Sequence, residues 1–139
     1  MSQKTLLNAT EIHVALHRLA CQLIENHNDF SQTVLIGIQP RGGFLAKRLV
    51  RLLQNDYKIK DVQLGLLDIT FYRDDFRRSE KPLEANKTAI DFVVEDKKVV
   101  FIDDVLYTGR SIRSALTAIQ DFGRPTEIEL LTLIDRRFS

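Results

Sequence analysis

The stretch Val99–Phe122, VVFIDDVLYTGRSIRSALTAIQDF, guides the interpretation of the whole sequence. It opens with four apolar residues, Val99–Ile102, which are enough for a buried strand. Two carboxylates follow, Asp103 and Asp104, and after them come a short turn and an amphipathic helix. Backbone N–H groups at such a turn and at a helix N-terminus can surround a phosphate. The order of strand, acid pair, turn and helix therefore predicts an anion-binding site.

The turn between the acid pair and the helix carries residues that suit a phosphate. Gly109 permits a positive φ or a close backbone approach, and the hydroxyls of Thr108 and Ser111 add hydrogen-bond donors. Asp103 and Asp104 repel each other at contact distance, so they need a ligand that offsets the repulsion. A sugar diol, which donates two hydrogen bonds, is one such ligand, and a divalent cation is another.

This segment resembles the phosphoribosyl pyrophosphate (PRPP) signature of type I phosphoribosyltransferases. The version DDVLYTGRS is most similar to that of the pyrimidine operon attenuation regulator (PyrR) family, and the resemblance extends over residues 8–137. It implies that the two acids, as catalytic residues, hold the ribose 2- and 3-hydroxyls of PRPP. The implied binding segment for the ribose 5-phosphate is Asp103, Asp104, Val105, Leu106, Tyr107, Thr108, Gly109, Arg110 and Ser111. The implied reaction is uracil plus PRPP giving UMP plus pyrophosphate.

Length and composition are those of one globular domain. The chain has 139 residues, of which 44% are hydrophobic, and its formal net charge of +1 gives no overall field that favours nucleic acid. The single cysteine, Cys21, excludes an internal disulfide and fits a reducing compartment. The N-terminus lacks the apolar segment of a signal peptide, and no apolar run reaches membrane-spanning length. We therefore expect a single phosphoribosyltransferase-type domain over residues 1–139, located in the cytoplasm.

Hydrophobic periodicity predicts helices that alternate with strands. A first helix, capped by Asn8 or Thr10, should end near residues 26–28. Further helices are expected at 44–54 and from 112, and strands at 33–38, 62–72 with a bulge at Gly65, 88–94, 99–102 and 127–134. This order predicts an α/β fold of the type I phosphoribosyltransferase kind, with a mainly parallel, twisted sheet flanked by helices.

The first loop at the expected carboxyl edge of this sheet is a turn, Gln39–Gly43, with one cation and two glycines. Ligands of parallel α/β sheets bind at that edge. The resemblance places the pyrophosphate-binding residues Pro40, Arg41 and Gly42 here, and it makes Arg41 catalytic. The Gln39–Pro40 bond can be cis at small cost. The alternative interpretation is a surface turn that starts a helix.

Residues 73–87, RDDFRRSEKPLEANK, are too polar to add to a core. A segment of this length without secondary structure is more often functional than idle. The resemblance makes it the flexible loop after a central strand that closes over PRPP. Arg73 and Arg77 are then expected to bind the pyrophosphate, together with Arg78 and Lys81. A solvated hairpin tip is the alternative.

Two single residues bear on the metal and on the base. Asp135 ends the last strand, where the resemblance suggests a carboxylate near Mg²⁺ and the pyrophosphate, although an aspartate here can also cap a turn. Mg²⁺ is otherwise expected to be held through PRPP. Tyr107 stands where related purine enzymes carry an aspartate, and a phenol with a pKa near 10 cannot act as that base. This favours a pyrimidine over a purine or another base, although no general base for uracil N1 is evident.

The resemblance also implies a second function, the binding of pyrimidine operon leader mRNA in response to uridine nucleotides. Arg18, Arg136 and Arg137 match the family's RNA-contacting residues in type, whereas His17 and Cys21 stand where threonine and histidine are expected. An enzyme without RNA regulation, or a nucleotide-binding domain without turnover, therefore remains an alternative. A homodimer or larger homo-oligomer is implied. A further C-terminal segment that forms a hood over the base is implied too, and here it is missing or truncated.

Overall fold

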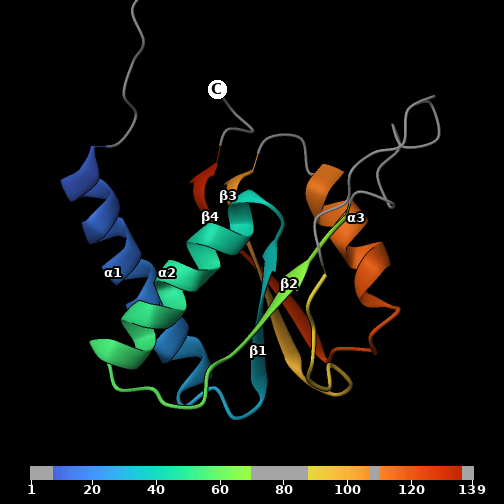
Figure 1. The fold of residues 1–139 in the computed structure, drawn as a ribbon. Helices are drawn as coiled ribbons and strands as arrows, with labels where there is room; N and C mark the ends of the chain where they lie inside the picture. The colour runs from blue at the N-terminus through green and yellow to red at the C-terminus, as the bar shows by residue number, and fades with distance from the viewer. Residues whose placement is uncertain (1–7, 70–87, 107–109, 136–139) are drawn as a thin grey trace, which may run out of the picture.

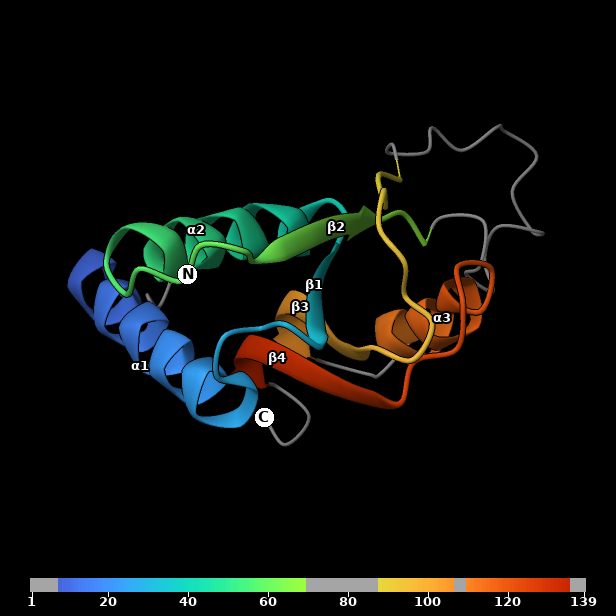
Figure 2. The same ribbon diagram turned by 90° about the horizontal axis from the view of Figure 1, so that it is seen from below.

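A computed structural model gives the structure of the chain and describes residues 8–69, 88–106 and 110–135. Its four strands form one parallel sheet in the order β2-β1-β3-β4: β1 (Thr33–Ile38), β2 (Gln63–Leu67), β3 (Lys98–Leu106) and β4 (Glu127–Asp135). Helices α1 (Ala9–His27) and α2 (Arg41–Asn55) lie on one side of the sheet, and α3 (Arg110–Ile119) lies on the other (Figure 1; Figure 2). The predicted α/β fold is confirmed. Among the described residues, no helix combines the length and apolarity needed to span a membrane.

Each face of the sheet has its own hydrophobic core. On one side, Leu49 of α2 packs with Leu35 of β1, and on the other, Ala115 of α3 packs with Phe101 of β3. All six residues of β1 are buried, which explains why the predicted strand TVLIGI shows no alternation of apolar and polar residues. The sheet is thus a central layer with a hydrophobic core on each face.

The starts of α1 and α2 differ in how they are capped. Asn8 caps α1 as predicted, because its side chain accepts a hydrogen bond from the Glu11 amide at 2.8 Å while the Glu11 carboxylate accepts one from the Asn8 amide. The helix ends at His27, as expected. By contrast, the residues Arg41–Gly43 that we predicted as a turn form the first turn of α2. Pro40 already has helical dihedral angles, φ −88° and ψ −30°, so the helix begins three residues early.

Two strand predictions need correction. β2 ends at Leu67, and Gly65 is not a bulge, because its pairing with β1 continues without a break from Gln63 to Leu67. Residues 88–94 form no strand: only Ala89 bridges to Leu66, in the antiparallel sense. The apolar residues of that segment, Ile90, Phe92 and Val94, pack instead on the face of the sheet that α3 covers. Core burial, rather than ladder pairing, therefore decides their conformation.

Candidate active site

Asp103 and Asp104 lie within β3, rather than after it as the sequence led us to expect. β3 pairs with β1 only as far as Ile102, and it then continues beside β4 to Leu106. The register partner of Asp103 on β4 is Thr132. Pairing with β4 therefore extends the strand past the end of β1, and both acids reach the carboxyl edge of the sheet, where parallel α/β sheets bind ligands.

Backbone amides hold the two half-buried carboxylates in place. The Asp104 amide donates to Asp103 Oδ1 at 2.9 Å, and the Val105 amide donates to Asp104 Oδ1 at 2.9 Å. The Thr132 hydroxyl lies 3.2 Å from the Asp104 carbonyl oxygen and 3.0 Å from the Ile134 carbonyl oxygen, so its one proton is shared between these two acceptors. These bonds orient the acids before any ligand is present, which is the condition for strong transition-state stabilisation.

The charge state of the acid pair is unusual. Burial, followed by the hydrogen bond to Asp104 and its negative charge, raises the pKa of Asp103 from its ordinary value of 3.8 to about 6. The backbone bond from Asp104 and the positive charge of Arg41 oppose this rise in the pKa. Ionised Asp103 is therefore costly in the free protein, and a ligand that supplies hydrogen-bond donors or positive charge would stabilise it.

The first turn of α2 lies against the same edge because glycines let the backbones meet. A Cβ on Gly42 would overlap the carbonyl oxygen of Ile102 and would lie 3.2 Å from the Cα of Asp103. A Cβ on Gly37 of β1 would lie only 2.8 Å from the carbonyl oxygen of Gly42. The backbones of β1, α2 and β3 are thus in contact, and Arg41 comes close enough for its charge to act on Asp103.

The start of α2 lacks the side-chain cap that α1 has. Pro40 makes no side-chain hydrogen bond to the helix, whereas α1 begins with a complete capping box. The first N–H groups of a helix need acceptors, and an anion can supply them. The Gln39–Pro40 peptide bond is cis, and the Gln39 amide donates to the Leu67 carbonyl oxygen at 2.9 Å. Arg41 and this helix start together form a site suited to a phosphate or pyrophosphate.

The structure brings four of the predicted residues together at the carboxyl edge: Arg41, Gly42, Asp103 and Asp104. α3 begins at Arg110 and Ser111, and β4 ends at Asp135, the register partner of Leu106. Arg18 is exposed on α1. Several predicted residues lie outside the described part of the chain: Arg73, Arg77, Arg78, Lys81, Tyr107, Thr108, Gly109, Arg136 and Arg137. Among the described residues, no three His, Cys, Asp or Glu side chains gather as metal ligands.

Sequence reasoning missed two residues that shape this edge. Gly37 stands inside an apolar strand and has no chemistry of its own, yet it allows α2 to approach β1. Thr132 supports the backbone of Asp104 from the neighbouring strand. Gly37 interrupts a run of large apolar residues, which was a usable signal, but the role of Thr132 depends on the strand register alone.

Comparison with known proteins identifies the class. Residues 2–139 match the family model of the phosphoribosyl transferase domain. In a solved structure, the purine phosphoribosyltransferase of Pyrococcus horikoshii Ot3, the same fold recurs with a TM-score of 0.64 at 25% identity, over 96% of this chain and 78% of that one. The chain is thus a phosphoribosyltransferase.

Curated relatives narrow the assignment. The "Bifunctional protein PyrR" of Caldicellulosiruptor bescii is 44% identical over 135 residues, which cover 96% of this chain and 72% of the relative. The protein of the same name from Gloeothece citriformis is 49% identical over 131 residues, or 94% of this chain and 73% of the relative. Within the phosphoribosyltransferases, this chain belongs to the PyrR family.

Proposed function

We propose that this chain transfers the phosphoribosyl group of PRPP to uracil, giving UMP and pyrophosphate. The observation that carries the proposal is that Asp103 and Asp104 lie beside Arg41 and the first turn of α2 at one edge of the sheet. Carboxylates accept hydrogen bonds from sugar hydroxyls about twice as strongly as neutral acceptors do. A guanidinium and the first N–H groups of a helix suit the pyrophosphate. Membership of the PyrR family supports the choice of reaction.

In the proposed reaction, the bond from ribose C1 to a pyrophosphate oxygen breaks as uracil N1 bonds to C1 and releases its proton to water. Positive charge develops on the sugar, and negative charge develops on the leaving group. The carboxylates of Asp103 and Asp104 would orient the sugar and favour its positive charge. Arg41 would stabilise the departing pyrophosphate, and the segment that ends in Ser111 would hold the 5-phosphate.

Mg²⁺ is the cofactor that we propose for this site. It prefers oxygen ligands and is commonly held by one or two carboxylates together with substrate phosphates. Asp103 and Asp104 supply carboxylates at the edge of the sheet, and the strand that ends at Asp135 reaches the same edge. When bound, Mg²⁺ would neutralise charge on the leaving pyrophosphate.

The choice of base is tested by release of pyrophosphate from PRPP and Mg²⁺ with uracil, orotate, hypoxanthine, guanine or xanthine. We expect turnover with uracil, because a tyrosine at position 107 does not offer a purine the carboxylate partner found in related enzymes. Turnover with a purine but not with uracil would reverse the assignment. If none of these bases leads to pyrophosphate release, a nucleotide-binding domain without turnover would be favoured.

Binding of a pyrimidine operon leader RNA is the second function that we propose. The PyrR relatives are named bifunctional, and Arg18 is exposed on α1, where a phosphate could reach it. A filter-binding titration with the leader hairpin should give tighter binding than with random RNA, and the affinity should fall steeply with salt. Equal binding of the leader hairpin and of random RNA would mean that the chain is an enzyme without RNA regulation.

Sedimentation would test the homodimer or larger oligomer that we expect.

A further inference from the structure

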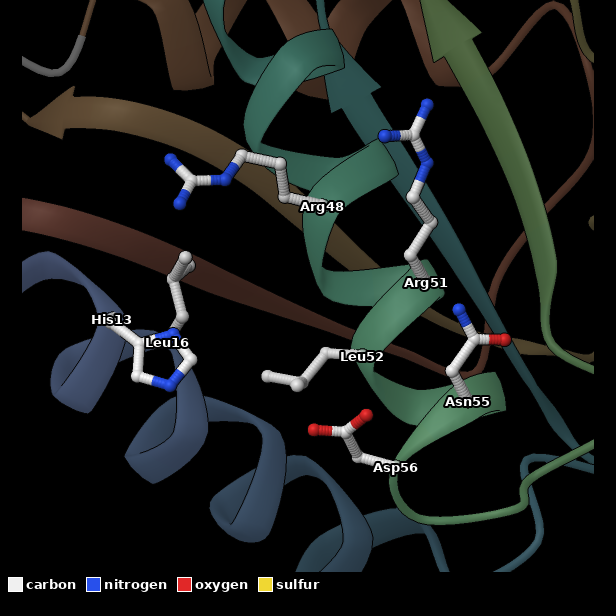
Figure 3. A pocket seen from close by; sticks show the side chains of 7 residues that line it. All are labelled: His13, Leu16, Arg48, Arg51, Leu52, Asn55 and Asp56. Atoms are coloured by element: carbon white, nitrogen blue, oxygen red, sulfur yellow. The ribbon is translucent and has the colours of Figure 1, made fainter.

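A cleft lies between α1 and α2, away from the acid pair. Figure 3 shows His13 and Leu16 on α1 facing Leu52 on α2. The cleft has a volume of about 270 Å³, and its lining residues are His13, Leu16, Arg48, Arg51, Leu52, Asn55 and Asp56. Arg48 lies two helical turns beyond Arg41, about 10 Å further along α2. The cleft is therefore separate from the proposed active site.

Positive charge dominates the α2 side of this cleft. α2 contains four cations, Arg41, Lys47, Arg48 and Arg51, and no acid. Within the described residues, the ion pairs are His17 with Asp56 and His27 with Glu129, so neither Arg48 nor Arg51 has a carboxylate in range.

Asp56 is the one acid in the lining, and it lies 3.8 Å from His17 Nε2. One acid therefore stands beside two arginines in the lining, and the excess of positive charge attracts anions.

The geometry of the cleft separates a charged part from an apolar part. The Arg48 side chain extends toward the α1 side, where His13 lies, whereas Arg51 points away from α1 (Figure 3). Leu16 and Leu52 lie between the two helices and form an apolar floor. A volume of about 270 Å³ exceeds that of a bare oxyanion and is close to the lower end for small-molecule sites.

We propose that this cleft binds a small phosphate monoester with a compact ring as its body. The phosphate would bind to the Arg48 guanidinium and the His13 imidazole, because charge-assisted bonds to phosphate are the strongest that these groups make. The ring would cover Leu16 and Leu52. Arg51 would add to the positive field without contacting the phosphate directly.

The histidine signals of the ¹⁵N-labelled full chain provide the test, because the chain has only three histidines. The probes are phenyl phosphate, inorganic phosphate and phenol. We expect phenyl phosphate to shift the His13 signal saturably and at lower concentration than inorganic phosphate, and we expect phenol to have little effect. The His13→Gln variant assigns the signal. Buried His27 lies at the other end of α1 and should not respond, so it serves as an internal control.

Charge variants on α2 identify the residues responsible. Arg48→Gln should weaken phenyl phosphate binding about tenfold or more, and Arg51→Gln only about two- to threefold, because a direct charge-assisted bond is worth more than a screened charge. Lys47→Gln is the matched control: Lys47 is exposed on α2 but does not line the cleft, so affinity should stay nearly unchanged. Thermal unfolding checks that each variant is folded.

Four outcomes would overturn the proposal. A His13 signal that does not saturate with phenyl phosphate shows that there is no site. Equal weakening by Lys47→Gln and Arg48→Gln means that diffuse charge attracts the anion. If phenol binds as tightly as phenyl phosphate, the cleft recognises the apolar ring and not the phosphate. A short RNA oligonucleotide that shifts His13 at lower concentration than phenyl phosphate makes the cleft a nucleic-acid contact instead.

Discussion

The two edges of the sheet are built on opposite principles. At the carboxyl edge, Asp103 and Asp104 are adjacent acids, and burial helps to raise the pKa of Asp103 to about 6. Toward the amino edge, His27 is buried with both ring nitrogens engaged. Its Nδ1 lies 2.8 Å from the Thr33 hydroxyl, and its Nε2 lies 3.0 Å from Glu129 Oε2.

The difference shows where the chain completes its own interactions and where it leaves them to a ligand. The His27 cluster joins the end of α1 to β1 and β4, and every group in it finds a partner within the chain. In the acid pair, by contrast, ionisation of the Asp103 carboxyl is costly without a ligand. Such a cost is typical of functional sites, where local stability is given up for activity. Substitutions at the acid pair should therefore mainly change activity, whereas substitutions in the His27 cluster should mainly lower stability.

The largest effect is expected from Asp104→Asn at the carboxyl edge. Loss of the negative charge removes an acceptor for the ribose hydroxyls, so turnover should fall about tenfold or more. Steady-state release of pyrophosphate measures the rate, and circular dichroism checks that the fold is kept. An unchanged rate would remove the proposed role of Asp104.

The corresponding substitution at the amino edge is His27→Ala. It leaves the Thr33 hydroxyl and the Glu129 carboxylate without their partner, so the free energy of unfolding should fall by about 1–3 kcal/mol. Urea titration measures this fall, and His13→Ala, at an exposed position on the same helix, should cost much less. Activity per folded molecule should not change. A loss of activity without a loss of stability would mean that His27 acts in the reaction, and the proposed difference between the edges would be wrong.

Asp103→Asn should stabilise the protein, and the effect should depend on pH. The pKa of Asp103 is raised from 3.8 to about 6 in the folded state, so this group favours folding below the lower value and loses that contribution as pH rises through the higher one. The full shift corresponds to about 3 kcal/mol. Because the carboxyl is partly exposed, we expect a gain of about 1–2 kcal/mol in the variant near neutral pH.

Denaturant titrations of wild type and Asp103→Asn should therefore diverge as pH rises from about 4 to about 6, the two pKa values, and the difference should level off above that range. A difference in unfolding free energy that stays constant across this range would mean that the pKa of Asp103 is not raised.

The smallest effect is a shift of the pH profile in Arg41→Gln. The charge of Arg41 lowers the pKa of Asp103, so its removal should move the acid limb of kcat/KM upward by less than about one pH unit. This shift comes in addition to the lower rate expected from loss of the guanidinium. Arg48→Gln, which removes a cation further along α2, should leave the acid limb in place. An unmoved limb in Arg41→Gln would mean that Arg41 and Asp103 do not interact.

Local patterns in the sequence were enough for much of this fold. The predicted strand at 33–38 agrees with β1 at both ends, and the cap at Asn8 and the end of α1 near His27 are confirmed. These features depend on neighbouring residues: a continuous apolar run, a capping box and a helical period. The motif around Asp103 and Asp104 likewise predicted two acids at the carboxyl edge of the sheet, and β3 brings both of them to that edge.

The shape of the site depends on contacts that no local pattern encodes. α2 begins at Arg41 and packs against β3, because Gly42 meets the carbonyl of Ile102, far away in the sequence. β3 extends through Asp103 because β4 pairs with it beyond the end of β1. Residues 88–94 leave the ladder because their side chains enter a core. A sequence determines what each segment prefers by itself, but register and close backbone approach arise only when distant segments pack together.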